Sequence, residues 1–257
     1  MARFLPLSAA LAALLVLPAA APRAETPVDL ELVLAVDISS SVNFDEYRLQ
    51  MAGYAAAFRD DALVDAIRRG APHGVATALV QWSGTGEQRV AVAWRLIDDA
   101  ATAAAFADRI DAAHRAFRGG QTDIGDAIAF AAGLFADNGY LSPRQIIDVS
   151  GDGRTNQGAP PAAARDAALA HGLTVNGLAV RGDVPTLDGY YLDHVIGGPA
   201  SFALAADDFD DFAAAILGKL ITEIAGIPIA SADAPAYVAA STPARKAARL
   251  APSDGLR

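Results

Sequence analysis

A nearly continuous run of apolar residues that ends in an acidic, serine-rich loop constrains the fold of this chain most strongly. Residues 30–36 are Leu-Glu-Leu-Val-Leu-Ala-Val, and the loop that follows carries Asp37, Ser39 and Ser41. A run of this kind is typical of a buried strand in a parallel sheet. Because parallel sheets bind their ligands at the carboxyl ends of strands, we expect this loop to lie at a binding edge.

Strand-like and helix-like segments alternate along the rest of the chain. Strands are expected at 30–36, 75–82, 89–96, 144–149, 174–180 and 201–205, and helices at 44–58, 102–117, 123–136, 161–171, 190–195 and 209–226. Asn43 and Glu46 have the spacing of a capping box at the start of the first helix. This alternation predicts an α/β fold, with a doubly wound, mostly parallel central sheet flanked by helices on both faces, as in Rossmann-like proteins. The strands 75–82 and 89–96 are expected to pair as a hairpin.

Two terminal segments are expected to lie outside this domain, which we place at residues 29–226. Residues 1–24 combine Arg3 with an apolar stretch and a small-residue end, which is typical of a secretory signal peptide. An uncleaved membrane anchor is the alternative, but the apolar stretch is short and contains Pro6. Residues 227–257 are rich in Ala, Pro and Ser and predict a disordered tail. Because arginine greatly outnumbers lysine and alanine abounds, we expect a bacterial protein that is periplasmic or secreted, with no membrane span after signal cleavage.

The charge of the chain excludes some partners. The net charge is −10, and removing residues 1–24 takes away two arginines and no acids, which leaves −12. No basic stripe interrupts this acidity, so nucleic-acid binding is not expected. An acidic surface does not attract a carboxylate, and a bound cation would have to supply that attraction. The chain has no cysteine, so disulfides cannot stabilise it.

Acidic and hydroxyl side chains recur in loops at three separate places in the chain. The first loop carries Asp37, Ser39 and Ser41, the second carries Thr122, and the third carries Asp152 between two glycines. Each residue alone is an ordinary cap or turn residue. Together they supply hard oxygen ligands that suit Mg²⁺, Mn²⁺ or Ca²⁺. In a doubly wound sheet the first and third loops can be neighbours where the strand order reverses.

This ordered set resembles the metal-ion-dependent adhesion site of von Willebrand factor A-like domains. The pattern of that family is Asp-x-Ser-x-Ser, then a distant threonine, then a distant aspartate that is commonly followed by glycine. The resemblance covers about residues 29–226 and is greatest for an exported bacterial branch, a domain of unknown function. Ser150-Gly151-Asp152 departs from the threonine-aspartate-glycine often seen at the third loop, although the carboxylate and the glycine after it remain.

The resemblance implies a role for each of these residues. Ser39 and Ser41 would bind the metal directly, and Thr122 would do so in a ligand-competent state. Asp37 and Asp152 would act mostly through bound water, which leaves the ion electrophilic toward an outside ligand. Mg²⁺ suits such a site because it retains water and octahedral geometry. An aspartate or glutamate of a protein partner would then fill the open position.

Other residues near these loops have two interpretations each. Asp123 and Asp126 either interact with the dipole of the helix that follows Thr122 or support the metal as outer groups. Five further residues either form a rim that contacts the partner or pack as ordinary loop residues: Trp82, Arg154, Asn156, Tyr190 and Tyr191.

The leading hypothesis is an exported, non-enzymatic, divalent-metal-dependent module that binds an acidic residue of a protein partner. The alternative is a Mg²⁺-dependent hydrolase of phosphate esters that uses Asp37 as nucleophile. Ser39 stands where such hydrolases have a second aspartate, which disfavours this alternative. A serine hydrolase is also disfavoured, because the chain has four histidines but no Gly-x-Ser-x-Gly motif.

Overall fold

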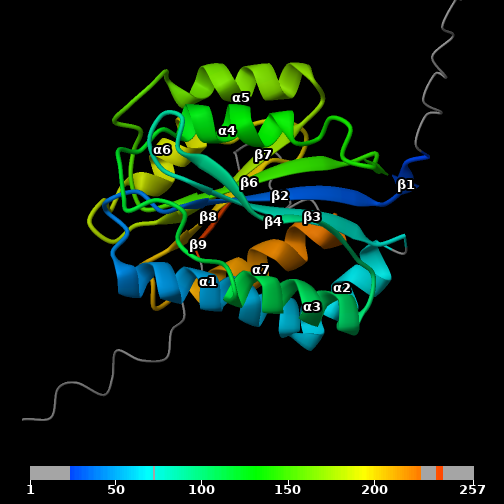
Figure 1. The fold of residues 1–257 in the computed structure, drawn as a ribbon. Coiled ribbons are helices and arrows are strands. Elements are labelled where there is room, and N and C mark those ends of the chain that lie inside the picture. Colours follow the sequence, from blue (N-terminus) through cyan, green and yellow to red (C-terminus); the bar gives the residue numbers. More distant parts are fainter. Residues whose placement is uncertain (1–23, 72, 227–235, 240–257) are drawn as a thin grey trace, which may run out of the picture.

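The computed structural model describes residues 24–71, 73–226 and 236–239, and it places a seven-stranded sheet between two layers of helices (Figure 1). The strands are β1 (Thr26–Pro27), β2 (Leu30–Asp37), β3 (Val75–Trp82), β4 (Gln88–Ile97), β5 (Tyr140–Leu141), β6 (Gln145–Gly151), β7 (Thr174–Val180), β8 (Phe202–Ala206) and β9 (Ala236–Ala239). The helices are α1 (Phe44–Arg59), α2 (Asp61–Gly70), α3 (Ala100–Asp111), α4 (Ile124–Gly133), α5 (Pro161–Ala170), α6 (Leu187–His194) and α7 (Phe212–Ala225).

The sheet has the predicted doubly wound topology. Its strand order is β4-β3-β2-β6-β7-β8-β9, and only the β3–β4 hairpin is antiparallel. From β2 the chain first builds outward to β3 and β4, and then returns to build β6, β7 and β8 on the other side. The strand order therefore reverses between β2 and β6, which is where open α/β sheets bind ligands. A separate two-stranded sheet pairs β1 with β5.

Both faces of the sheet are covered, which explains why β2 is apolar along nearly its whole length. Leu30, Leu32, Leu34 and Val36 face one core, with α1, α2, α3 and α7. Val33 and Ala35 face the other, with α4, α5 and α6 (Figure 1). All eight residues of β2 are buried. Burying one leucine side chain contributes about 1.5–3 kcal/mol, so this strand anchors both layers.

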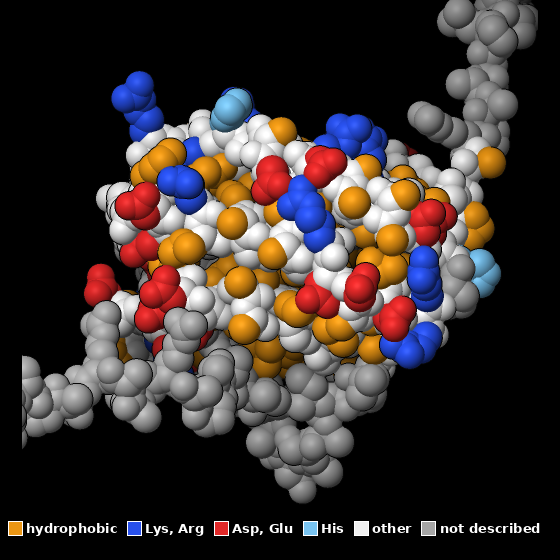
Figure 2. All heavy atoms as spheres, turned by 90° about the horizontal axis from the view of Figure 1, so that it is seen from below, with side chains coloured by type: hydrophobic (Ala, Val, Ile, Leu, Met, Phe, Trp, Pro, Cys, Tyr) orange, Lys and Arg blue, Asp and Glu red, His pale blue; other side chains and the backbone are white. Residues whose placement is uncertain are grey.

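Figure 2 shows the outer face of the layer that contains α1, where charged side chains of both signs are scattered among small apolar ones.

Most predicted elements are present, although their ends differ. The structure also contains α2, β1, β5 and β9, which the sequence does not predict. The β3–β4 hairpin and the Asn43–Glu46 capping box are confirmed. The helix expected at 102–117 ends at Asp111. Strand β9 pairs with β8 inside the range for which a tail is predicted. The rest of that range and nearly all of the predicted signal peptide lie outside the described residues. Within those residues, every helix is too short or too polar to span a membrane.

Candidate metal centre

The loops that follow β2 and β6 lie side by side at the carboxyl edge of the sheet. The two strands pair in parallel, with Val36 opposite Ser150. Both strands therefore end at the same edge, and the loop of Asp37 meets the loop of Asp152. The sequence-based prediction that these loops are neighbours across the reversal of strand order is confirmed.

A chain of short hydrogen bonds joins the polar side chains of these two loops. The Ser39 backbone N–H donates to Oδ1 of Asp37 at 2.7 Å. The hydroxyl oxygens of Ser39 and Ser41 lie 3.1 Å apart, and Ser41 donates to Oδ1 of Asp152 at 2.6 Å. Ser39 and Asp37 are fully buried, whereas Ser41 is exposed. The site therefore has a buried base and an open outer end.

Thr122 joins this group from the second loop, and Asn156 holds it there. The Thr122 N–H donates to Oδ1 of Asn156 at 2.8 Å, and the Asn156 N–H donates to the Thr122 carbonyl at 2.9 Å. A methyl group on Gly153 would lie 3.8 Å from Oγ1 of Thr122, so this hydroxyl is beside the loop of Asp152. The structure thus brings all the predicted metal-binding side chains to one place, and it gives Asn156 a bracing role.

Arg115 fixes the shape of the Asp37 loop, and sequence reasoning missed it. Its Nη2 atom donates to the carbonyls of Ile38, Ser39 and Val42 at 2.8, 3.0 and 2.7 Å. Nε2 of Gln50 also donates to the Asp37 carbonyl, at 3.1 Å. Because these contacts join residues far apart in sequence, no local motif could have revealed them.

The electrostatics of the site favour a cation. Burial raises the pKa of Asp37 to about 8, with a further contribution from the charge of Asp152, and hydrogen bonds from Ser39 oppose the shift. Burial also raises the pKa of Asp152, while the bond from Ser41 lowers it. Among the described residues, Oδ2 of Asp37 is buried and has no hydrogen-bond partner. A buried, unpaired carboxylate oxygen is costly, and a nearby cation would offset that cost.

The donor set also fits a hard cation, because all its members are carboxylate or hydroxyl oxygens. Nowhere in residues 24–71, 73–226 and 236–239 do three or more His, Cys, Asp or Glu side chains form a group that could hold a metal. A site here must therefore use hydroxyls as well as carboxylates. Oxygen donors of this kind disfavour soft metals.

A cleft of about 440 Å³ opens over the site, and its walls are acidic. Ser41, Thr122 and Asp152 line its floor, together with Arg154 and Asn156. Its remaining charged residues are all acidic: Glu46, Asp183, Asp208 and Asp210. Glu46 and Asp183 are close enough for their charges to add to the raised pKa of Asp152. An anion would be repelled from this cleft unless a cation were bound.

Asp123 and Asp126 serve the scaffold of the site. Oδ1 of Asp123 caps α4 by accepting from the Asp126 N–H at 2.9 Å, and Oδ2 of Asp123 accepts from the Thr85 hydroxyl at 2.5 Å. Oδ2 of Asp126 accepts from the Gly86 N–H at 2.7 Å. Both side chains therefore tie α4 to the turn between β3 and β4. These contacts give both residues a structural role at the start of α4, where the predicted interaction with the helix dipole also applies.

The predicted partner rim needs correction at two residues. Trp82 at the end of β3 and Tyr191 on α6 are fully buried in the same hydrophobic core, and neither can touch a partner. Arg154 is exposed at the cleft, where it donates to the Thr186 hydroxyl at 2.9 Å and lies 5.4 Å from the centre of the Tyr190 ring. Asn156 is exposed there as well. Arg154, Asn156 and the half-buried Tyr190 are therefore the rim residues that remain.

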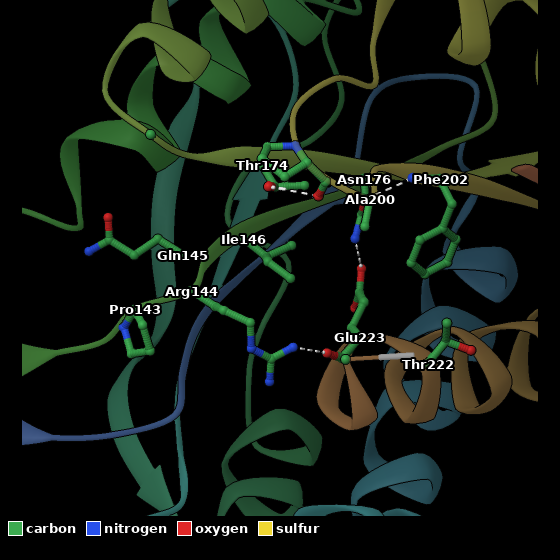
Figure 3. Close-up of a pocket in the computed structure, with 13 residues that line it drawn as sticks. Pro143, Arg144, Gln145, Ile146, Thr174, Asn176, Ala200, Phe202, Thr222 and Glu223 are labelled. Carbon is green, nitrogen blue, oxygen red and sulfur yellow. Dashed lines mark hydrogen bonds between the residues drawn. The ribbon is translucent and has the colours of Figure 1, made fainter. Parts of the chain in front are cut away.

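A second cavity, of about 250 Å³, lies at the opposite end of the sheet (Figure 3). Arg144 donates there to the last carbonyls of α7, those of Glu223 and Ile224, at 2.9 and 3.0 Å. Asn176 donates to Oε1 of Glu223 at 2.8 Å, and Lys219 forms buried ion pairs with Glu223 and Asp148. These contacts hold α7 on the sheet. The cavity is distant from the loops that sequence analysis identified.

Comparison with solved structures shows the same fold in several proteins. Proximal thread matrix protein 1 from the mussel byssus matches 78% of this chain with a TM-score of 0.59 and 21% identity, and the match covers 49% of that protein's chain. Another structure of that protein, with a zinc-occupied MIDAS motif, matches with a TM-score of 0.56 and 19% identity over 78% of this chain and 49% of that one. A von Willebrand factor type A protein from Catenulispora acidiphila matches with a TM-score of 0.52 and 17% identity, over 77% of this chain and 43% of that one.

This chain spans about half or less of the length of those proteins, so the likeness concerns the fold of one domain. A comparison with curated proteins found no match. The family described as "Protein of unknown function (DUF1194)" matches residues 27–228, which includes the whole predicted domain. On this evidence the chain belongs to that family, and its domain has the von Willebrand factor A-like fold.

Proposed function

We propose that this protein is an exported binding module that captures an acidic residue of a protein partner through a divalent cation. Ser39, Ser41 and Thr122 would hold the cation through their hydroxyls, and Asp37 and Asp152 would hold it through water. When bound, the cation would supply an electrophilic position for an outside carboxylate. The observation that carries the proposal is the unpaired, buried Oδ2 of Asp37 beside a converging set of hard oxygen donors.

The acidic cleft supports a cation-dependent mode of capture. Glu46, Asp183, Asp208 and Asp210 surround the approach to the site. A partner's aspartate or glutamate would meet unfavourable charge on every side except at Arg154. A divalent cation at the floor reverses this balance at one point, because it is the largest local charge. Capture should therefore fail completely when the cation is removed.

Two further features support the proposal. A solved relative in fold carries zinc at its MIDAS motif, which is the kind of site proposed for this chain. We propose Mg²⁺, with Mn²⁺ or Ca²⁺ as the other candidates, because the donors here are all oxygen. Export depends on the predicted signal peptide at residues 1–24, and secretion of a reporter fused to these residues would test it.

Thermal unfolding with and without MgCl₂ tests the cation site. At one hundred times its Kd, a cation that binds only the folded state adds about 2.7 kcal/mol, or roughly 5–10 °C for a domain of this size. The double variant Ser39→Ala, Ser41→Ala should lose this gain. Ser40→Ala is the matched control, because Ser40 lies between them and is exposed. Equal gains in all three proteins would refute the site.

The partner is tested by capture from a periplasmic extract. Immobilised protein should retain a partner in MgCl₂ and release it in EDTA, and the double serine variant should retain none. If the same proteins were retained in MgCl₂ and in EDTA, capture through the cation would be refuted.

The purified protein also tests the hydrolase alternative. That alternative requires steady turnover of a generic phosphate ester, and the turnover must be lost in Asp37→Asn. Lys219 cannot assist such chemistry, because it is fully buried in an ion pair with Asp148.

A further inference from the structure

Tyr191 is buried directly beneath the candidate metal centre. It lies on α6 and is fully buried, and its ring packs against β7, where a methyl group on Gly177 would lie 2.5 Å from the ring carbon Cδ1. Its hydroxyl reaches the end of β6, where a methyl group on Gly151 would lie 2.9 Å from the Tyr191 oxygen. Glycines on two neighbouring strands therefore make room for this one side chain.

The Tyr191 hydroxyl also lies close to the carboxylate of Asp37. A methyl group on Gly151 would lie 2.8 Å from Oδ2 of Asp37, so both oxygens are within 3 Å of one position. A small side-chain shift or one water molecule can join them. Both atoms are buried, and neither has a hydrogen-bond partner within the described part of the chain. Two unpaired buried oxygens at one place cost stability, which points to a role beyond packing.

The chemistry of the two groups is complementary. A phenol is a hydrogen-bond donor at neutral pH, and a carboxylate only accepts. Burial and the nearby charges of Asp37 and Asp152 raise the pKa of Tyr191 well above its usual value, so the hydroxyl keeps its proton. Oδ1 of Asp37 already accepts from Ser39, and Oδ2 is the atom that still needs a donor.

We propose that Tyr191 is a positioning residue, whose hydroxyl donates to Oδ2 of Asp37 and orients that carboxylate toward the bound cation. This proposal rests on the proposed cation site. With both oxygens of Asp37 held, the carboxylate has one orientation from which to accept a metal-bound water. Hydrogen-bond partners of this kind commonly change metal affinity by 10–100-fold when they are removed.

The sequence pattern of von Willebrand factor A-like domains often has a threonine before the aspartate of the third loop. Here Gly151 stands there, and the Tyr191 hydroxyl occupies the space a side chain would fill.

The variant Tyr191→Phe tests the proposal, because it removes the hydroxyl and keeps the ring in its place against Gly177. Isothermal titration with MgCl₂ should give a Kd at least tenfold higher than that of the wild type. Tyr54→Phe is the control, because Tyr54 is also fully buried but donates its hydroxyl to Ser150 at 3.1 Å. Its Kd should stay within about threefold of the wild type, in line with an interaction that does not touch Asp37.

Two further readouts separate positioning from a general structural effect. Adding MgCl₂ to the wild type should produce a tyrosine ultraviolet difference spectrum, as the buried phenol gains an acceptor, and Tyr191→Phe should lose it. In EDTA, Tyr191→Phe should unfold at the wild-type temperature or above, because it loses an unpaired polar atom. An unchanged Kd in Tyr191→Phe, or a wild type that binds Mg²⁺ without a tyrosine difference spectrum, would overturn this inference alone. A wild type that binds no divalent cation would overturn the proposed function as well.

Discussion

The substitution Asp37→Asn should stabilise the metal-free protein while removing its response to Mg²⁺. In the unfolded chain this carboxyl has a pKa near 3.8, whereas burial raises the pKa to about 8 in the fold. At a pH between 3.8 and about 8, Asp37 therefore takes up a proton when the chain folds. The contribution of Asp37 to stability is full below about pH 4 and is lost as pH rises to about 8.

The size of the effect follows from these two pKa values. Between about pH 4 and pH 7 the buried carboxyl of Asp37 lowers the free energy of unfolding steadily as the pH rises. Each of these about three pH units is worth about 1.36 kcal/mol, so the loss at pH 7 is up to about 4 kcal/mol. Asparagine has no charge to desolvate, and its amide oxygen still accepts from the Ser39 N–H. We therefore expect Asp37→Asn to raise the free energy of unfolding by about 2–4 kcal/mol. For a domain of this size that is roughly 5–15 °C.

Urea unfolding in EDTA at pH 5, 7 and 8 measures this effect. Burial raises the pKa of Glu223 to about 7, so this residue also makes the free energy of unfolding fall as the pH rises. Glu223 is present in both proteins, so the difference in free energy of unfolding between wild type and variant isolates the effect of Asp37. That difference should grow by about 1 kcal/mol per pH unit between pH 5 and 7. The control Asp193→Asn removes an exposed carboxylate and should change stability by less than about 0.5 kcal/mol. A variant that is less stable than the wild type at pH 7, or a difference that is constant with pH, would refute the reasoning.

Three more predictions concern the site and its support. In isothermal titrations the affinity for Mg²⁺ should rise from about pH 6 to pH 8 and then level off. The reason is that the buried carboxyl of Asp37, with a pKa of about 8, must release its proton before the cation binds. Lys219→Met should cost about 3–5 kcal/mol in urea unfolding, because it leaves Asp148 and Glu223 buried without their cation. Gly177→Ala should lower stability by about 1–3 kcal/mol and shift the near-ultraviolet spectrum, because its methyl group would lie 2.5 Å from the Tyr191 ring.

Local patterns in the sequence were enough to predict the order and type of most elements. The alternation of apolar runs set the strands, since each parallel strand is buried on both faces, and β3 and β7 match their expected ranges of 75–82 and 174–180. The Asn43–Glu46 capping box could be predicted because all its atoms lie within one turn. The two-residue strands β1 and β5 carry no period and could not be found.

Helix ends were predicted less well, and α3 shows the reason. Residues 112–117 have the composition of a helix, yet the chain leaves the helix after Asp111. Arg115 then contacts the carbonyls of the Asp37 loop, and the Gly120 carbonyl accepts from the Ser40 N–H at 3.0 Å. These long-range hydrogen bonds outweigh a helix propensity of a few tenths of a kcal/mol per residue.

The candidate site separates in the same way into a part that spacing encodes and a part that only the fold creates. Asp37, Ser39 and Ser41 have spacing that follows from one loop, and a family pattern exists for them. Tyr191 shares no motif with them and was expected at the rim, yet α6 places its hydroxyl against Gly151. A glycine before Asp152 is conspicuous only when the side chain that fills its space is known. A departure from a family pattern is therefore best examined for the residue, elsewhere in the chain, that takes over the missing atoms.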